Sequence, residues 1–121
     1  MSRVLVAEDN PINFELVLHV LESGGHEVEW AQDGEEAVRL ARASDHDVLL
    51  LDLHMPKLDG LAVVRLLRAD ERFTGLRILA LTADAMPGVR EELLAAGVDG
   101  YLTKPLDIAG LLSAVALQHT R

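Results

Sequence analysis

The sequence predicts an α/β fold in which a parallel sheet carries helices on both faces. Short apolar runs alternate along the 121 residues with stretches of helical spacing, five times over and with short connections. This is the pattern of βα units joined by right-handed crossovers. The run DVLLL (47–51) is apolar on both faces, as a central strand of a parallel sheet should be. We therefore expect one domain spanning residues 1–121.

The predicted strands differ in the way their apolar residues are arranged. The second alternates, with Val28 and Trp30 on one face and Glu27 and Glu29 on the other, so we expect it at an exposed edge of the sheet. The third and fourth are apolar on both faces and belong inside the sheet. Four strands are predicted at residues 3–7, 26–31, 47–51 and 77–83, and a short fifth strand is predicted within residues 98–105.

Helix boundaries are marked by proline, glycine and aspartate. Proline suits a first helical turn, glycine a helix end and aspartate an N-cap. These markers are Pro11, Asp33 and Pro87 at starts, Gly24, Gly25 and Gly97 at ends, and Asp107 at a cap. The apolar helix residues expected to share a face are Leu16, Val17, Val20 and Leu21, then Ala37, Leu40 and Ala41, then Val63, Val64 and Leu67 within 59–69. The final helix is expected to carry Ile108, Leu111, Leu112 and Val115.

Composition excludes several classes of function. The net charge is -9, the 11 basic residues are scattered and aromatics make up 3%, which argues against a nucleic-acid surface. The absence of cysteine removes disulfides, thiolate zinc sites and cysteine nucleophiles. Apolar runs of about five residues fall far short of the roughly 20 that a membrane helix needs, and the N-terminus lacks a signal-peptide core. We expect a soluble cytoplasmic protein with no membrane partner.

Polar side chains follow four of the apolar runs. In open parallel sheets, ligands bind beyond the carboxyl ends of the strands, so these residues are predicted to meet at one edge. Three neighbouring carboxylates would repel one another, and a hard divalent cation such as Mg2+ would relieve that repulsion. Together with a lysine and a hydroxyl, they suit a phosphoryl group. The residues are Glu8, Asp9, Asp52, Thr82 and Lys104.

Each of these residues has a plainer interpretation when it is taken alone. Asp9 could cap the first helix, and Asp52 could begin a turn before Pro56. A carboxylate directly after VLLL is nevertheless costly unless it is paired or bound to metal, which favours a functional role for Asp52. The other three could be ordinary strand or surface residues, and only their joint placement singles them out. His54 has no second histidine at a metal-ligand spacing and is interpreted as a rim group.

Four motifs in this order and spacing resemble the receiver domain of two-component response regulators. The resemblance covers essentially the whole chain, and the EDNPIN form is most similar to receivers of hybrid sensor kinases or to free-standing single-domain regulators. It implies a flavodoxin-like doubly wound sheet with strand order 2-1-3-4-5. The motifs are VLVAEDNPIN (4–13), DLHMPKLDG (52–60), LTA (81–83) and YLTKP (101–105).

The resemblance also implies residue roles at a metal site. Asp52 is the expected phosphoryl acceptor. Asp9 and Asp52 are the expected ligands of Mg2+ (or Mn2+), joined by the backbone carbonyl of His54, with Glu8 usually acting through water. Glu8 stands where many receivers have aspartate, which could change how directly it coordinates.

Further roles concern the phosphoryl group and the response to it. Thr82 and Lys104 are expected to contact the phosphoryl oxygens, and Tyr101 occupies the switch aromatic position. The peptide bond from Lys104 to Pro105 is typically cis in the family. The fourth helix, fifth strand and fifth helix, about residues 85–118, form the face expected to bind a downstream protein.

Two residues are expected to tune the loss of the phosphoryl group. His54 and Asp84 lie two positions beyond Asp52 and Thr82 and should flank an attacking water. The expected phosphodonor is a phosphohistidine of a histidine kinase or of a histidine phosphotransfer protein. The chain is not expected to act as an enzyme on anything except its own phosphorylation and dephosphorylation.

Rival functions fit the sequence less well. An aspartyl-phosphate phosphatase typically has a second aspartate two residues after the nucleophile, where this chain has His54, and also a cap domain. A flavodoxin-like electron carrier needs a glycine- and hydroxyl-rich loop after the first strand, where EDNPIN would repel a flavin phosphate. A receiver that is never phosphorylated is disfavoured because the expected site residues are present. No output domain follows Arg121, so output should depend on contacts, unless the chain is a piece of a larger protein such as a hybrid kinase.

Overall fold

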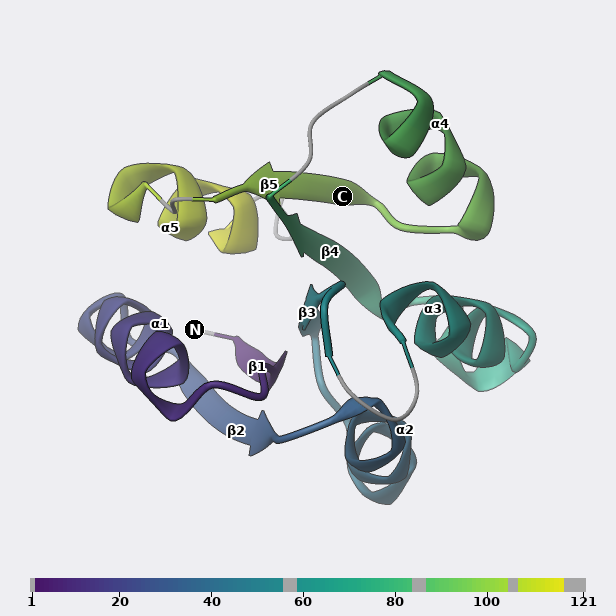
Figure 1. Cartoon of the computed structure of the whole chain (residues 1–121). Helices are drawn as coiled ribbons and strands as arrows, with labels where there is room; N and C mark the ends of the chain where they lie inside the picture. The colour runs from purple at the N-terminus through teal and green to yellow at the C-terminus, as the bar shows by residue number, and fades with distance from the viewer. Residues whose placement is uncertain (1, 56–58, 84–86, 105–106, 117–121) are drawn as a thin grey trace.

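The computed structural model describes residues 2–55, 59–83, 87–104 and 107–116. Within them, a five-stranded parallel sheet of order β2-β1-β3-β4-β5 carries helices on both faces (Figure 1), as predicted. The strands are β1 (Arg3–Ala7), β2 (Glu27–Ala31), β3 (Val48–Asp52), β4 (Arg77–Thr82) and β5 (Gly100–Thr103). The helices are α1 (Pro11–Ser23), α2 (Gly34–Ala43), α3 (Gly60–Arg68), α4 (Pro87–Ala96) and α5 (Ile108–Ala116), with a short 3-10 helix, η1 (Glu71–Phe73).

The central strand β3 is buried along its whole length and divides the core into two layers. Successive side chains of a strand point to opposite faces. Leu49 and Leu51 therefore pack with the apolar residues of α2, α3 and α4. Val48 and Leu50 pack on the other side with those of α1 and α5. This continuous apolar run thus explains why β3 lies in the middle of the sheet, with β1 and β4 beside it.

Helix α1 buries a different stripe from the one predicted. Leu16 is 55% exposed and Ile12 is 78% exposed, so the assignment of Leu16 to the inner face was wrong. The two residues are four apart and lie together on the side of the helix away from the sheet, because residues with that spacing share a face. Ile108 of α5 is likewise exposed. The buried residues of α1 are Phe14, Val17, Val20 and Leu21.

The predicted helix ends are confirmed where the structure describes them. Asp33 accepts a hydrogen bond from the N–H of Glu36 at the start of α2. Asp107 accepts one from the N–H of Gly110 in α5. Pro105, expected after a cis peptide bond, lies outside the described residues. The described helices are all too short or too polar to cross a membrane.

Candidate functional site

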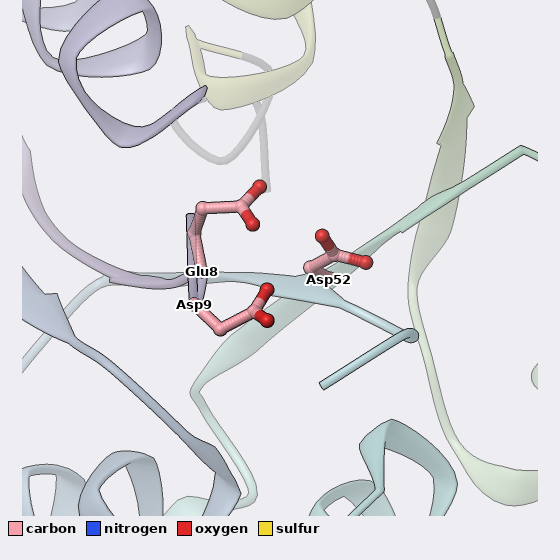
Figure 2. Close-up of side chains that lie close together, drawn as sticks. All are labelled: Glu8, Asp9 and Asp52. Carbon is pink, nitrogen blue, oxygen red and sulfur yellow. The ribbon is translucent and has the colours of Figure 1, made fainter. Parts of the chain in front are cut away.

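Three carboxylates meet at the carboxyl edge of the sheet, as the sequence predicts. Asp52 is the last residue of β3, and Glu8 and Asp9 follow the neighbouring strand β1. One carboxylate oxygen of each residue lies within 4.8 Å of the corresponding oxygens of the other two, and the three side chains are grouped together in Figure 2. Glu8 and Asp52 are each only 2% exposed, whereas Asp9 is exposed. The cluster therefore consists of two buried acids and one that faces the solvent.

Asp9 is left available by the residue that follows it. The cap of α1 is Asn10, whose Oδ1 accepts from the N–H of Ile12 at 2.9 Å and from that of Asn13 at 3.4 Å. Asp9 therefore does not serve as the helix cap, the alternative that the sequence left open. The Asn10-Pro11 pair carried the signal for this cap, because asparagine is favoured at the N-cap and proline at the first helical position.

Burial makes Glu8 a weaker acid than usual. The pKa of Glu8 is raised from 4.5 to about 7, mainly by loss of contact with water and in addition by the nearby Asp52 carboxylate. Two contacts lower it in part, namely the N–H of Asn10, which donates to Glu8 Oε2 at 3.2 Å, and the charge of Lys104. The Lys104 ammonium therefore offsets only part of the negative charge of the cluster, which keeps a deficit of positive charge. Oxygen ligands around such a deficit fit a hard divalent cation.

Both oxygens of Asp52 are held by hydrogen bonds. The backbone N–H of His54 donates to Oδ1 at 2.9 Å, and the Lys104 ammonium donates to Oδ2 at 2.8 Å. The Lys104 side chain comes from the end of β5, two strands away from β3, and is 29% exposed. The structure thus brings Lys104 onto Asp52 across the intervening strand. It fixes the orientation of the carboxylate at the end of the sheet.

Thr82 ends β4, the strand that lies between β3, which carries Asp52, and β5, which Lys104 follows. It is the last residue of β4, is 1% exposed, and accepts the N–H of Lys104 on its carbonyl at 2.9 Å. Its neighbour across the ladder is Thr103. Beside it is a pocket of about 240 Å3 whose lining residues are Leu53, His54, Asp59, Leu61, Thr82 and Val89.

The structure describes two of the three residues predicted to respond to the phosphoryl group or to tune its loss, namely Tyr101 and His54. Tyr101 of β5 is half-buried against the core layer under α2, α3 and α4, and the Arg90 guanidinium lies 5.8 Å from its ring centroid. The exposed His54 shares the pocket beside Thr82. Asp84 lies outside the described residues.

One contact of the site has no counterpart in the sequence prediction. The indole N–H of Trp30 donates to the backbone carbonyl of Glu8 at 2.7 Å. The two residues are separated by 22 positions. The only signal in the sequence was that Trp30 lies near the carboxyl end of the strand predicted beside the first.

The arrangement of Asp52, Lys104 and the two acids that follow β1 is suited to accepting a phosphoryl group. Asp52 presents a rigid carboxylate, Lys104 supplies positive charge, and the acids at the end of β1 can hold a cation. Fixed charges and dipoles of this kind stabilise a transferring phosphoryl group. Fold and site therefore define a phosphoacceptor module of the receiver class.

Comparison with known proteins gives the same class. The family model for the response regulator receiver domain matches residues 4–116, and the chain belongs to this family, whose members act in two-component signal transduction. A curated relative is the polar-differentiation response regulator DivK of Brucella ovis. It is 32% identical over 112 residues, which cover 93% of this chain and 91% of DivK.

Two solved structures of receiver domains are similar to this chain. The receiver domain of sensor histidine kinase PA1611 from Pseudomonas aeruginosa is 38% identical, with a TM-score of 0.91 and coverage of 99% of this chain and 98% of that one. That structure has a magnesium ion coordinated in its active site cleft. The Ssk1 receiver of Saccharomyces cerevisiae, in complex with the histidine phosphotransfer protein Ypd1, is 27% identical with a TM-score of 0.88. The match covers 94% of this chain and 86% of that one.

Proposed function

We propose that Asp52 accepts a phosphoryl group from a partner's phosphohistidine. The observation that carries the proposal is the buried, doubly hydrogen-bonded carboxylate at the end of β3, within reach of Lys104 and beside two further acids. An Asp52 oxygen attacks phosphorus, the new O–P bond forms as the P–N bond to imidazole breaks, and the imidazole leaves with the bonding electron pair. Positioning and charge neutralisation supply most of the catalysis in such a transfer.

We propose that Glu8, Asp9 and Asp52 hold Mg2+ or Mn2+, with the backbone carbonyl of His54 as a further ligand. The negative charge of the cluster, which Lys104 offsets only in part, supports this, as does the magnesium in the PA1611 receiver. When bound, the cation would neutralise charge on the phosphoryl oxygens. Thr82 and Lys104 would bind those oxygens from the other side of the group.

The experiment is mass spectrometry after incubation with acetyl phosphate and Mg2+. We expect one added phosphoryl group in the wild type and none in Asp52→Asn. Asp70→Asn is the matched control, because Asp70 is a half-buried acid that caps η1 and does not belong to the carboxylate cluster. An Asp52→Asn protein that keeps the label, or an Asp70→Asn protein that loses it, would contradict the assignment.

We propose that the donor is a histidine kinase or a histidine phosphotransfer protein in the cytoplasm. The complex of the Ssk1 receiver with Ypd1 and the kinase origin of the PA1611 receiver support this class of partner. Phosphotransfer from a panel of phosphorylated histidine proteins would identify the donor. Transfer from none of them, together with acetyl phosphate labelling of Asp52, would contradict the donor class and leave the acceptor role intact.

We propose that the downstream partner binds the face formed by α4, β5 and α5, and that His54 and Asp84 set the lifetime of the phosphoryl group. The half-buried Tyr101 supports the first role, because it lies between that face and the core. The exposed His54 beside the pocket at Thr82 supports the second. Dephosphorylation rates of His54→Ala and Asp84→Ala that equal the wild-type rate would contradict the tuning role.

A further inference from the structure

Trp30, the single tryptophan of the chain, joins three elements next to the carboxylate cluster. It lies on the edge strand β2, and its indole N–H donates to the carbonyl of Glu8 at 2.7 Å. Its ring stacks on Phe14 of α1, with centroids 4.5 Å apart and planes 6° from parallel. One side chain therefore contacts both the end of β1 and the beginning of α1, on either side of Asp9.

The hydrogen bond from Trp30 completes the anchoring of Glu8. The pairing of β1 with β2 ends at Ala7 and Ala31. One further backbone bond runs from the N–H of Glu8 to the carbonyl of Ala31, at 3.0 Å. The carbonyl of Glu8 is bound instead by the indole. Both backbone polar groups of Glu8 are thus held by β2, although the regular ladder has already ended.

These two backbone bonds act against the repulsion among the three carboxylates. Charges within 4.8 Å of one another repel strongly where little water separates them. Movement of the β1–α1 junction away from β3 would relieve the repulsion between Asp52 and the two acids at the end of β1. The same movement would also increase the distances between the carboxylate oxygens that a bound cation must contact at the same time. Mg2+ demands ligands at about 2.0–2.1 Å in nearly octahedral geometry, so a spread cluster binds it less tightly.

We propose that Trp30 is a positioning residue of the cation site, which raises the affinity for Mg2+ by holding Glu8 and Asp9 close to Asp52. This inference rests on the proposed metal-binding function. An aliphatic residue at the same position of β2 would also cover the apolar layer under α1, as Val28 does. The indole adds the donor that reaches the carbonyl of Glu8.

The test compares Mg2+ affinities of two β2 variants with the wild type. Trp30→Phe keeps an aromatic ring beside Phe14 but removes the N–H. Val28→Ala removes packing from the same strand and the same apolar layer but leaves the bond to Glu8 in place. We expect the Mg2+ Kd, followed by the backbone amide resonance of His54, to rise about 3–10-fold in Trp30→Phe, as the loss of one hydrogen bond implies. In Val28→Ala we expect it to stay within about twofold, while both variants lose thermal stability.

A second readout uses the one indole N–H resonance of the wild type. We expect it to shift on addition of Mg2+ with the same Kd as the His54 amide. Should Trp30→Phe fail to fold, β-(3-benzothienyl)alanine at position 30 keeps the ring shape and replaces the N–H by sulfur, with the same expected fold-change.

The outcomes separate this inference from the proposed function. A wild type that does not bind Mg2+, or an Asp9→Asn variant that binds it equally well, would overturn both the metal site and the role of Trp30. Binding that depends on Asp9 but is unchanged, within twofold, when the indole N–H is removed would overturn only the role of Trp30. An indole resonance that does not move on Mg2+ binding would overturn it too.

Discussion

Glu8 combines deep burial with a negative neighbour, and its ionisation therefore opposes folding. Its pKa is raised to about 7 in the folded protein, mainly by burial, from an ordinary value of 4.5. Between these two values the folded state binds more protons than the unfolded state. The stability that this group contributes is consequently full below about pH 4.5 and is lost as the pH rises through 7.

Replacing Glu8 by glutamine should remove this pH dependence. In the presence of a chelator, we expect Glu8→Gln to be more stable than the wild type at pH 8, by on the order of 2 kcal/mol, because one pKa unit corresponds to about 1.4 kcal/mol. At pH 4 the difference should vanish. Urea unfolding at the two pH values measures it, with Glu15→Gln, an exposed acid of α1, as control. An equal difference at both pH values would count against the ionisation of Glu8 as the cause.

Asp9 should govern the stabilisation by Mg2+. A cation that binds only the folded state adds about 2.7 kcal/mol at a concentration 100 times its Kd. We expect the wild-type Tm to rise by several degrees at saturating Mg2+ and the rise to shrink by more than half in Asp9→Asn. Without metal, Asp9→Asn should be at least as stable as the wild type, since one repelling charge is gone. Differential scanning calorimetry measures both, and an undiminished rise would refute the assignment of Asp9 as a ligand.

At the scale of elements, Arg68 ties the end of α3 to two other segments. Its Nε donates to the carbonyl of Gly97 at 2.8 Å, and its terminal nitrogens donate to the carbonyl of Phe73 at 2.7 Å and to Asp99 at 2.8 Å. These bonds join α3 to η1 and to the turn between α4 and β5. Asp99 also accepts the N–H of Ile78 in β4. One guanidinium therefore links the segments that precede β4 and β5, at the end of the sheet away from the carboxylate cluster.

Gly97 should be hard to replace at this junction. Its φ of +115° is unfavourable for any residue with a side chain, and an added Cβ would lie 2.7 Å from Arg68 Cγ. We expect Gly97→Ala to lower the free energy of unfolding by about 2–4 kcal/mol in urea denaturation. Gly88→Ala, in the first turn of α4 and with open space around the new Cβ, should change it by less than about 1 kcal/mol. Similar losses in both variants would show that the backbone at Gly97 is not strained.

Sequence patterns predicted the elements because the relevant signals are local. Apolar runs defined β3 and β4, and Asp33 and Asp107 marked helix starts that the structure confirms. The face of α1 was misjudged at Leu16 because its apolar residues surround much of the helix, and periodicity alone does not say which side meets the sheet.

The meeting of Asp52 with Glu8 and Lys104 followed from topology, since parallel strands end at the same edge. Contacts made by long side chains could not be predicted in this way. The bonds from Trp30 to Glu8 and from Arg68 to Gly97 join residues 22 and 29 positions apart. In each case the acceptor is a backbone carbonyl, a group that every residue carries, so no residue type marks the partner.

At the scale of the whole molecule, the proposed phosphoryl site and the proposed output face are joined by the neighbouring strands β4 and β5. Thr82 ends β4 beside Lys104, and Tyr101 lies on β5 opposite Ala80 in the β4–β5 ladder. Phosphorylation would add about -1.5 to -2 charges at Asp52. The hydroxyl of Thr82 can donate to the new oxygens, and its movement would change the space between β4 and α4, where the pocket beside Val89 lies.

Tyr101 should follow that movement and carry the change to the face of α4, β5 and α5. Before phosphorylation its ring is half-buried beside Arg90 of α4. A cation–ring contact of this kind is worth about 0.5–1 kcal/mol at an exposed site. The ring positions before and after phosphorylation therefore need differ little in energy. A partner that binds one position better than the other would shift the equilibrium only by that difference in affinity. We expect beryllofluoride with Mg2+, a mimic of the aspartyl phosphate, to move the NMR resonances of Tyr101 and of residues 87–116.

Two variants make this coupling testable. Arg90→Met removes the cation over the ring and should alter the Tyr101 resonances before beryllofluoride is added, while the amides next to Asp52 respond to the mimic as in the wild type. Asp52→Asn should abolish all the shifts, because the mimic has no carboxylate to bind. Shifts confined to the loops around Asp52, with Tyr101 and α4 unmoved, would refute the coupling even where phosphorylation of Asp52 is established, since the charge would then be neutralised locally without reaching β5.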